Sequence, residues 1–169
     1  RSKAVKSAVL ILFYPGEKSI QTVFILRPQY DGVHAGQVAF PGGRAEPEDS
    51  SIIETALREA EEEVNIKPSS VTVLGTLTDL YIPPSNYIVT PVVGRSHTIP
   101  EFKREPAEVA EIIEADAGFI LDPSLIKETV IYARGFNIEA PYFDVKGFVV
   151  WGATAMILSE LKTVIESIE

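Results

Sequence analysis

The chain has no cysteine among its 169 residues, which excludes disulfides, thiol catalysis and cysteine-based zinc or iron–sulfur sites. It also lacks an apolar run long enough to span a membrane, and its first residues lack a signal-peptide core, so we expect a cytoplasmic protein without a membrane partner. Basic residues are few: 15 Lys and Arg stand against 24 Asp and Glu, a net charge of −9. Such a surface repels nucleic acid, so any phosphate ligand must meet a local cation or a metal ion.

What the chain does contain is enough apolar material for a core, with 46% hydrophobic and 23% charged residues. We expect residues 1–169 to form a single domain, because no Pro- and Gly-containing stretch is long enough to be a linker and no repeat is visible. Apolar runs predict β-strands over residues 7–14, 22–26, 38–40, 71–78, 88–94 and 143–150.

Two segments carry helical patterns. The first begins with a capping box, Ser51-x-x-Glu54, and the second runs from about residue 154 to 168. The apolar face of the first helix consists of Ile53, Leu57, Ala60 and Val64. A weaker pattern predicts a third helix at 106–113 or at 123–127. Strands with interspersed helices predict a mixed sheet covered by helices.

Chemistry is concentrated in residues 46–63, which contain eight acids and a single base, Arg58. Three of the acids share a roughly 100° arc of the first helix beside its apolar face: Glu59, Glu62 and Glu63. Carboxylates this close repel one another unless a cation joins them, and hard Mg²⁺ or Mn²⁺ suits such oxygen ligands better than zinc. The alternative is a solvated helix face. The preceding Gly42-Gly43, which allows a tight turn and a close backbone approach to phosphate, favours the metal site.

Residues 43–66 resemble the Nudix box, G-x5-E-x7-R-E-U-x-E-E-x-G-U with U aliphatic, and residues 58–66 (REAEEEVNI) match its second half. The first acid is Asp49 rather than Glu, and eight residues rather than seven follow it before the arginine. Ala60 is small for the aliphatic position, and Asn65 replaces the box glycine. Asparagine is the residue that best replaces glycine as a left-handed helix cap, so this last change is mild.

The similarity extends to the coenzyme A pyrophosphatase branch of this family, which also carries the longer spacing with Asp first. The segments that carry it span about residues 23 to 160: Leu26-Arg27, residues 34–43 (HAGQVAFPGG), residues 87–94 (YIVTPVVG), Glu108-Val109 and residues 151–155 (WGATA). One departure is Asp31-Gly32, where the branch has Leu-Arg.

The resemblance implies an α/β fold, a Nudix-type α/β/α sandwich with a mixed β-sheet. It implies a Nudix hydrolase, a diphosphatase that uses Mg²⁺ or Mn²⁺ on a small nucleoside diphosphate derivative. Coenzyme A or an acyl-CoA is the expected substrate, giving 3′,5′-ADP and 4′-phosphopantetheine or its acyl form. Because of Asp31-Gly32, the same chemistry on ADP-ribose, dinucleotides or nucleoside triphosphates stays open. A non-catalytic Nudix ligand-binding module is the alternative of another class, and a homodimer is left open.

The resemblance also assigns roles to single residues. The implied metal ligands are Glu59, Glu62 and Glu63, and Arg58 is expected to orient a box carboxylate through a charge-assisted hydrogen bond. The general base stays open between Glu59 and a downstream loop acid, Glu108 or Glu111, whose alternative is a polar helix face. The implied catalytic set is therefore Arg58, Glu59, Glu62, Glu63 and Glu108. The implied substrate-binding residues are Arg27, His34, Gly42, Gly43 and Tyr87. Of the remaining candidates, Trp151 is expected in the core and His97 in an exposed loop.

Overall fold

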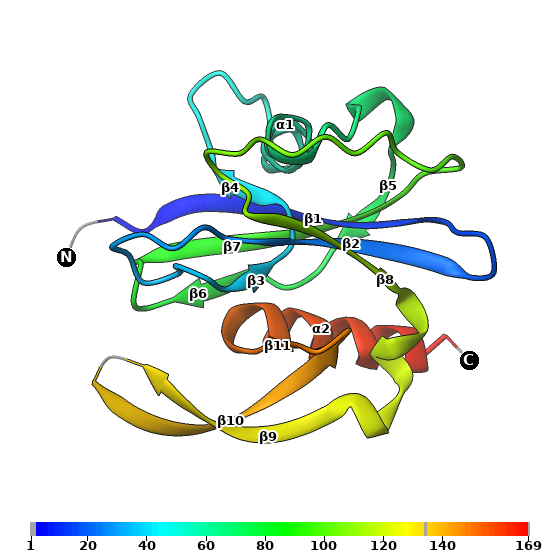
Figure 1. Cartoon of the computed structure of the whole chain (residues 1–169). Coiled ribbons are helices and arrows are strands. Elements are labelled where there is room, and N and C mark those ends of the chain that lie inside the picture. Colours follow the sequence, from blue (N-terminus) through cyan, green and yellow to red (C-terminus); the bar gives the residue numbers. More distant parts are fainter. Residues whose placement is uncertain (1–2, 134, 169) are drawn as a thin grey trace.

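A large mixed sheet lies between helix α1 on one side and a layer formed by helix α2 and a smaller sheet on the other (Figure 1). The computed structural model describes residues 3–133 and 135–168. The large sheet comprises β1 (Val5–Pro15), β2 (Ile20–Leu26), β3 (Val38–Ala39), β4 (Gly42–Arg44), β5 (Thr72–Thr76), β6 (Leu80–Ile82), β7 (Tyr87–Arg95) and β8 (Glu111–Asp116). Its strands follow the order β3–β2–β1–β7–β5, with β4 beside β1, β6 beside β7 and β8 beside β2.

The second layer follows in the last third of the chain. Its elements are β9 (Ile126–Ala133), β10 (Phe136–Val145), β11 (Phe148–Val150) and α2 (Gly152–Glu166), and the first helix is α1 (Ile52–Val64). Short 3-10 helices cover Pro68–Ser70, Ala117–Leu121 and Pro123–Leu125. The predicted mixed α/β fold is confirmed, and a three-stranded antiparallel sheet, β11–β10–β9, is separate from the large sheet. The predicted strand at 143–150 corresponds to the end of β10 and to β11, whereas β9 was not predicted.

The position of strand β1 between the two cores explains why residues 7–14 are apolar on both faces. Leu10 and Leu12 pack with the buried face of α1, whereas Ile11 packs with Leu158 of α2 in the second core. Strand β1 also pairs in parallel with β7 over its first nine residues, so it lies in the interior of the sheet. A strand that is covered on both faces has a continuous apolar sequence rather than an alternation of apolar and polar residues.

Helix α1 begins and ends as its sequence predicts, with one difference. The Ser51 hydroxyl accepts a hydrogen bond from the Glu54 amide at 3.2 Å, but the Glu54 carboxylate accepts from the Ser50 amide instead of closing the box on Ser51. At the other end Asn65 adopts φ 63° and ψ 29°, the left-handed cap expected in place of glycine. The most buried face is turned slightly from the predicted one, because Ala56 is fully buried while Leu57 is only half-buried.

The predicted third helix is wrong. Residues 111–116 form β8, which pairs with β2, and residues 123–125 form only one 3-10 turn. The physical reason is the alternation of buried and exposed side chains in this segment: Ile113 and Ala115 face the core while Glu114 is exposed. As expected, His97 is exposed; Trp151 is half-buried at the start of α2.

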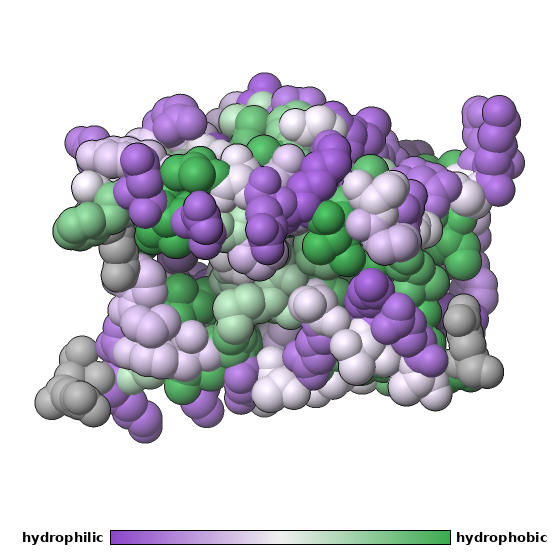
Figure 2. Space-filling model, turned by 90° about the horizontal axis from the view of Figure 1, so that it is seen from below, coloured by the Kyte–Doolittle hydropathy of each residue, from purple (hydrophilic) through white to green (hydrophobic). Residues whose placement is uncertain are grey.

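Figure 2 shows the underside of the molecule, where hydrophobic patches lie among hydrophilic residues. Large apolar side chains are exposed on the β9–β10 hairpin, with Tyr132 74% and Phe136 73% exposed. Among the described residues, no helix is both long and apolar enough to cross a membrane.

Candidate active site

Three carboxylates converge next to β4. Glu59 and Glu63 stand one turn apart on α1, Glu108 comes from the loop before β8, and one oxygen of each lies within 4.8 Å of the others. Carboxylates gathered in this way repel one another, and a divalent cation reverses the sign of that interaction. The donor set contains only oxygens, so it fits Mg²⁺ or Mn²⁺ and is poorly suited to a soft metal.

The deepest of these acids is Glu63, which is 3% exposed. Burial raises its pKa to about 8, although the Gly42 amide donates a hydrogen bond to its Oε2 at 2.9 Å. Burial also raises the pKa of Glu59. Both carboxyl groups therefore hold protons more tightly than usual while no cation is bound, and a bound cation would favour the ionised forms.

The glycine pair forms strand β4 rather than the predicted tight turn, and it is needed for close approach. A Cβ on Gly42 would lie 2.2 Å from the carbonyl oxygen of Ala8, because β4 is pressed against β1. A Cβ on Gly43 would lie 2.6 Å from both carboxylate oxygens of Glu59. A side chain at position 43 would therefore push the Glu59 carboxylate away from the strand.

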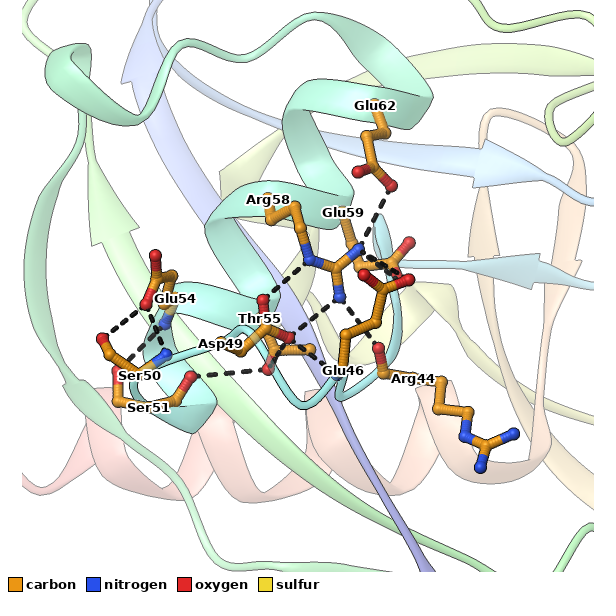
Figure 3. A network of polar contacts seen from close by, with 10 residues as sticks. All are labelled: Arg44, Glu46, Asp49, Ser50, Ser51, Glu54, Thr55, Arg58, Glu59 and Glu62. Carbon is orange, nitrogen blue, oxygen red and sulfur yellow. Dashed lines mark hydrogen bonds and ion pairs between the residues drawn. The ribbon is translucent and has the colours of Figure 1, made fainter.

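Arg58 is the centre of the polar network beside these acids (Figure 3). Its Nε donates to Asp49 Oδ1 at 2.8 Å and its Nη2 to Asp49 Oδ2 at 3.0 Å, a bidentate pair. Its Nη1 donates to Glu59 at 3.1 Å and to Glu62 at 3.2 Å. The Thr55 hydroxyl also donates to Asp49, at 2.8 Å. The guanidinium of Arg58 holds the pKa of the Asp49 carboxyl well below its usual range. Asp49 thus anchors Arg58, and Arg58 orients Glu59.

The structure separates the predicted acids into two groups. Glu59, Glu63 and Glu108 come together, whereas the side chain of Glu62 is 53% exposed and pairs with Arg58. Glu62 as a metal ligand stays a prediction. Of the two loop acids, Glu108 joins the group and Glu111 begins strand β8, opposite Leu26.

A cavity of about 400 Å³ lies on the other side of β4. All five predicted substrate-binding residues line it: Arg27, His34, Gly42, Gly43 and Tyr87. Gly42 and Gly43 therefore border the cavity and also contact the carboxylates of α1. Arg44 and Tyr30 also line the cavity but were not predicted as substrate-binding residues. Arg44 could have been found from the sequence, because it directly follows the glycine pair.

Residues 28–37 form a closed loop on one wall of the cavity. The Arg27 amide donates to the Gln37 carbonyl at 2.9 Å, and the Gly36 amide to the Pro28 carbonyl at 3.2 Å. Within the loop, His34 Nδ1 lies 3.4 Å from the side-chain oxygen of Gln37. Burial lowers the pKa of His34, so its ring is neutral at pH 7 and serves as a hydrogen-bonding group rather than a charge. The fixed positive charges of the cavity are then the two arginines.

Comparison with known proteins agrees with this arrangement. The model of the NUDIX domain matches residues 5–119. An uncharacterized Nudix hydrolase NudL from Photorhabdus laumondii is 44% identical over 128 residues, which are 76% of this chain and 68% of that protein. The protein of the same name from Yersinia pestis is also 44% identical over 128 residues, 76% of this chain and 64% of its own. The chain thus spans about two thirds of the length of these curated relatives.

Solved structures share the fold. A Nudix hydrolase from M. smegmatis, RenU, superposes with a TM-score of 0.65 at 16% identity, covering 98% of this chain and 88% of that one. A C. elegans Ap4A hydrolase binary complex has a TM-score of 0.56 at 15% identity, covering 65% and 79%. The NUDIX domain of Shewanella oneidensis NrtR complexed with ADP ribose has a TM-score of 0.51 at 16% identity, covering 66% and 72%. At such identities the likeness shows the fold alone.

Proposed function

Because this chain belongs to the Nudix hydrolase family, we propose that it hydrolyses the diphosphate linkage of coenzyme A or an acyl-CoA with the help of Mg²⁺ or Mn²⁺. The products are 3′,5′-ADP and 4′-phosphopantetheine or its acyl form. The observation that carries the proposal is the position of Gly42 and Gly43, which lie between a group of three carboxylates and a cavity with two arginines. An anionic diphosphate needs both the arginines and a cation held by the carboxylates, because the protein as a whole is strongly acidic and would otherwise repel it.

The residues that would hold the cation are Glu59, Glu63 and Glu108, with Glu62 next to them on α1. A bound Mg²⁺ or Mn²⁺ supplies positive charge for the phosphoryl oxygens and lowers the pKa of water. Arg58 keeps Glu59 in place, so this carboxylate is oriented before the substrate arrives. We assign the general base to Glu59 or Glu108.

The cavity supports recognition of a nucleoside diphosphate derivative. Arg27 and Arg44 supply charge for the phosphates, and the neutral His34 adds a hydrogen-bonding group. The rest of the lining is aromatic or apolar over much of its extent and suits a base or a pantetheine chain: Tyr30, Val33, Ile82, Tyr87, Val89 and Ile157. A mixed lining of this kind is typical of cofactor-sized ligands.

ADP-ribose is the second candidate substrate. Dinucleotides and nucleoside triphosphates are the remaining candidates. The observation that favours it is Asp31-Gly32, which leaves the cavity loop without the arginine of the coenzyme A branch. The fold neighbour that contains ADP ribose is in keeping with this candidate. The homodimer and the cytoplasmic location stay predictions.

The test is product analysis by mass spectrometry with Mg²⁺ and, separately, Mn²⁺. The substrates are coenzyme A, an acyl-CoA, ADP-ribose, NADH, a diadenosine polyphosphate and dATP. Formation of 3′,5′-ADP from coenzyme A supports the first candidate, and cleavage of ADP-ribose alone supports the second. Calorimetric binding of a compound without any product would support the non-catalytic ligand-binding module instead.

A further inference from the structure

One glycine of the cavity loop is covered by an aromatic ring. A Cβ on Gly32 would lie 2.2 Å from Cε2 and 2.8 Å from Cδ2 of Tyr30, so the ring occupies the space of a side chain at position 32. The Gly32 amide also donates to the Tyr30 carbonyl at 2.9 Å. Gly32 is not among the glycines with positive φ, so its backbone does not require glycine. A side chain at position 32 would instead have to push the Tyr30 ring aside.

The covered ring is part of the cavity wall. Tyr30 is 50% exposed and lines the cavity together with Gly32 and, from β7, the ring of Tyr87. Within the described residues its hydroxyl has no hydrogen-bond partner, so the ring is not held there by its polar end. A half-exposed aromatic face in a ligand cavity is a suitable surface for stacking against a planar group.

The loop holds this ring before any ligand binds. Its ends are joined by the backbone hydrogen bonds that Arg27 and Gly36 donate. Gly36, at φ +66°, is covered in turn by Gln29, whose Nε2 would lie 2.2 Å from a Cβ at that position. The side chains of Gln29 and Tyr30 therefore fold back over the two glycines of the loop, and the Tyr30 ring lies on Gly32 before any ligand binds. A preordered contact surface loses less entropy when a ligand binds.

We propose that Tyr30 stacks on the nucleobase of the substrate and that Gly32 determines specificity by seating the Tyr30 ring. The inference rests on the proposed function, whose candidate substrates all carry a nucleoside, and it names the residues that would contact the base. It also accounts for Asp31-Gly32: a large side chain at position 32 would displace the ring, so the chain has an aromatic wall where its branch has an arginine.

Two ligands that differ only in the base provide the test, because their binding needs no turnover. The affinities of AMP and of ribose 5-phosphate are measured by calorimetry for the wild type, Tyr30→Leu, Tyr30→Phe and Gly32→Ala. Tyr30→Leu weakens AMP binding about tenfold, since an aromatic–base stack has about this worth, and leaves ribose 5-phosphate unaffected. Tyr30→Phe keeps the wild-type affinity. Gly32→Ala weakens AMP binding like Tyr30→Leu, and the double variant Tyr30→Leu/Gly32→Ala is no weaker than Tyr30→Leu alone.

A matched control separates stacking from a loss of aromatic surface in general. Tyr81 is 51% exposed, but it lies outside the cavity lining, so Tyr81→Leu leaves AMP affinity unchanged. Equal losses for AMP and ribose 5-phosphate in Tyr30→Leu would overturn the proposal, as would a Gly32→Ala protein with wild-type affinity. Failure of the proposed hydrolysis can be told apart from failure of this inference. If no substrate is cleaved but the variants change AMP affinity as described, the hydrolytic activity is wrong and the role of Tyr30 stands.

Discussion

The two ends of the site are built differently. The catalytic end depends on polar side chains bonded to one another or to a neighbouring strand: Asp49 is bonded to Arg58, and the buried Glu63 is bonded to the backbone of β4. The substrate end is half-exposed and held by backbone hydrogen bonds and glycines in residues 28–37. The difference suggests that changes at the first end alter the rate and the stability, whereas changes at the second end alter the affinity.

The largest effect is expected for Glu63→Gln. Loss of this carboxylate removes a cation ligand and should reduce kcat about a thousandfold. Thermal stability at neutral pH should not fall, because burial already disfavours the ionised Glu63. Steady-state kinetics and thermal melting check both parts. An unchanged rate with a lower melting temperature would make Glu63 a structural residue.

The next effect is on the free energy of unfolding. Arg58→Ala leaves Asp49, whose side chain is 5% exposed, without its ionic partner and should cost about 3 kcal/mol. The matched control is Lys67→Ala, which breaks the exposed pair with Glu61 and should cost about 0.5 kcal/mol or less. Urea unfolding measures both variants. Equal losses would show that the Arg58 network is no stronger than a surface pair.

At the substrate end, Arg44→Ala should raise KM about tenfold and leave kcat nearly unchanged, since a charge-assisted bond to phosphate is lost. Arg95, an exposed arginine at the end of β7 and outside the cavity lining, provides the control substitution. A lower kcat with an unchanged KM would assign Arg44 to the catalytic end and contradict the proposed difference between the two ends.

The smallest effect concerns pH. The folded-state pKa of Glu63 is raised from 4.5 to about 8, so its stabilising contribution is complete below about pH 4.5 and is lost as the pH rises through about 8. A cation binds the ionised form, so the increase in melting temperature caused by Mg²⁺ should be greater above about pH 8 than near pH 5. Glu63→Gln should remove most of this difference. A Mg²⁺ effect that is independent of pH would contradict the role of Glu63.

Much of the catalytic end could be predicted from the sequence because it is local. The Ser51 cap, the Asn65 cap and the one-turn spacing of Glu59 and Glu63 all follow from helix periodicity. Glu108 could be named as one of two candidates, but its approach to α1 depends on how the chain folds around β8. Local patterns contain no such tertiary information.

The remaining differences have physical causes. The weak pattern that predicts a helix at 106–113 or at 123–127 also fits a helical face, and over residues 111–116 pairing with β2 decides for β8. The roles of Tyr30 and Gly32 depend on a ring folded back over a backbone, which spacing does not reveal. Strand β9 and the first part of β10 were missed because the outer part of their hairpin, including Tyr132 and Phe136, is exposed and lacks a clear apolar alternation.

The most direct test of the central claim, that the carboxylates of α1 hold a divalent cation, is Mn²⁺ binding followed by electron paramagnetic resonance. The variants are Glu63→Gln and, as a control on the same helix, Glu61→Gln, whose carboxylate pairs with Lys67 outside the group of three. Wild type and Glu61→Gln should bind Mn²⁺ equally, and Glu63→Gln should bind it at least about tenfold more weakly. Equal binding by all three proteins would contradict the account.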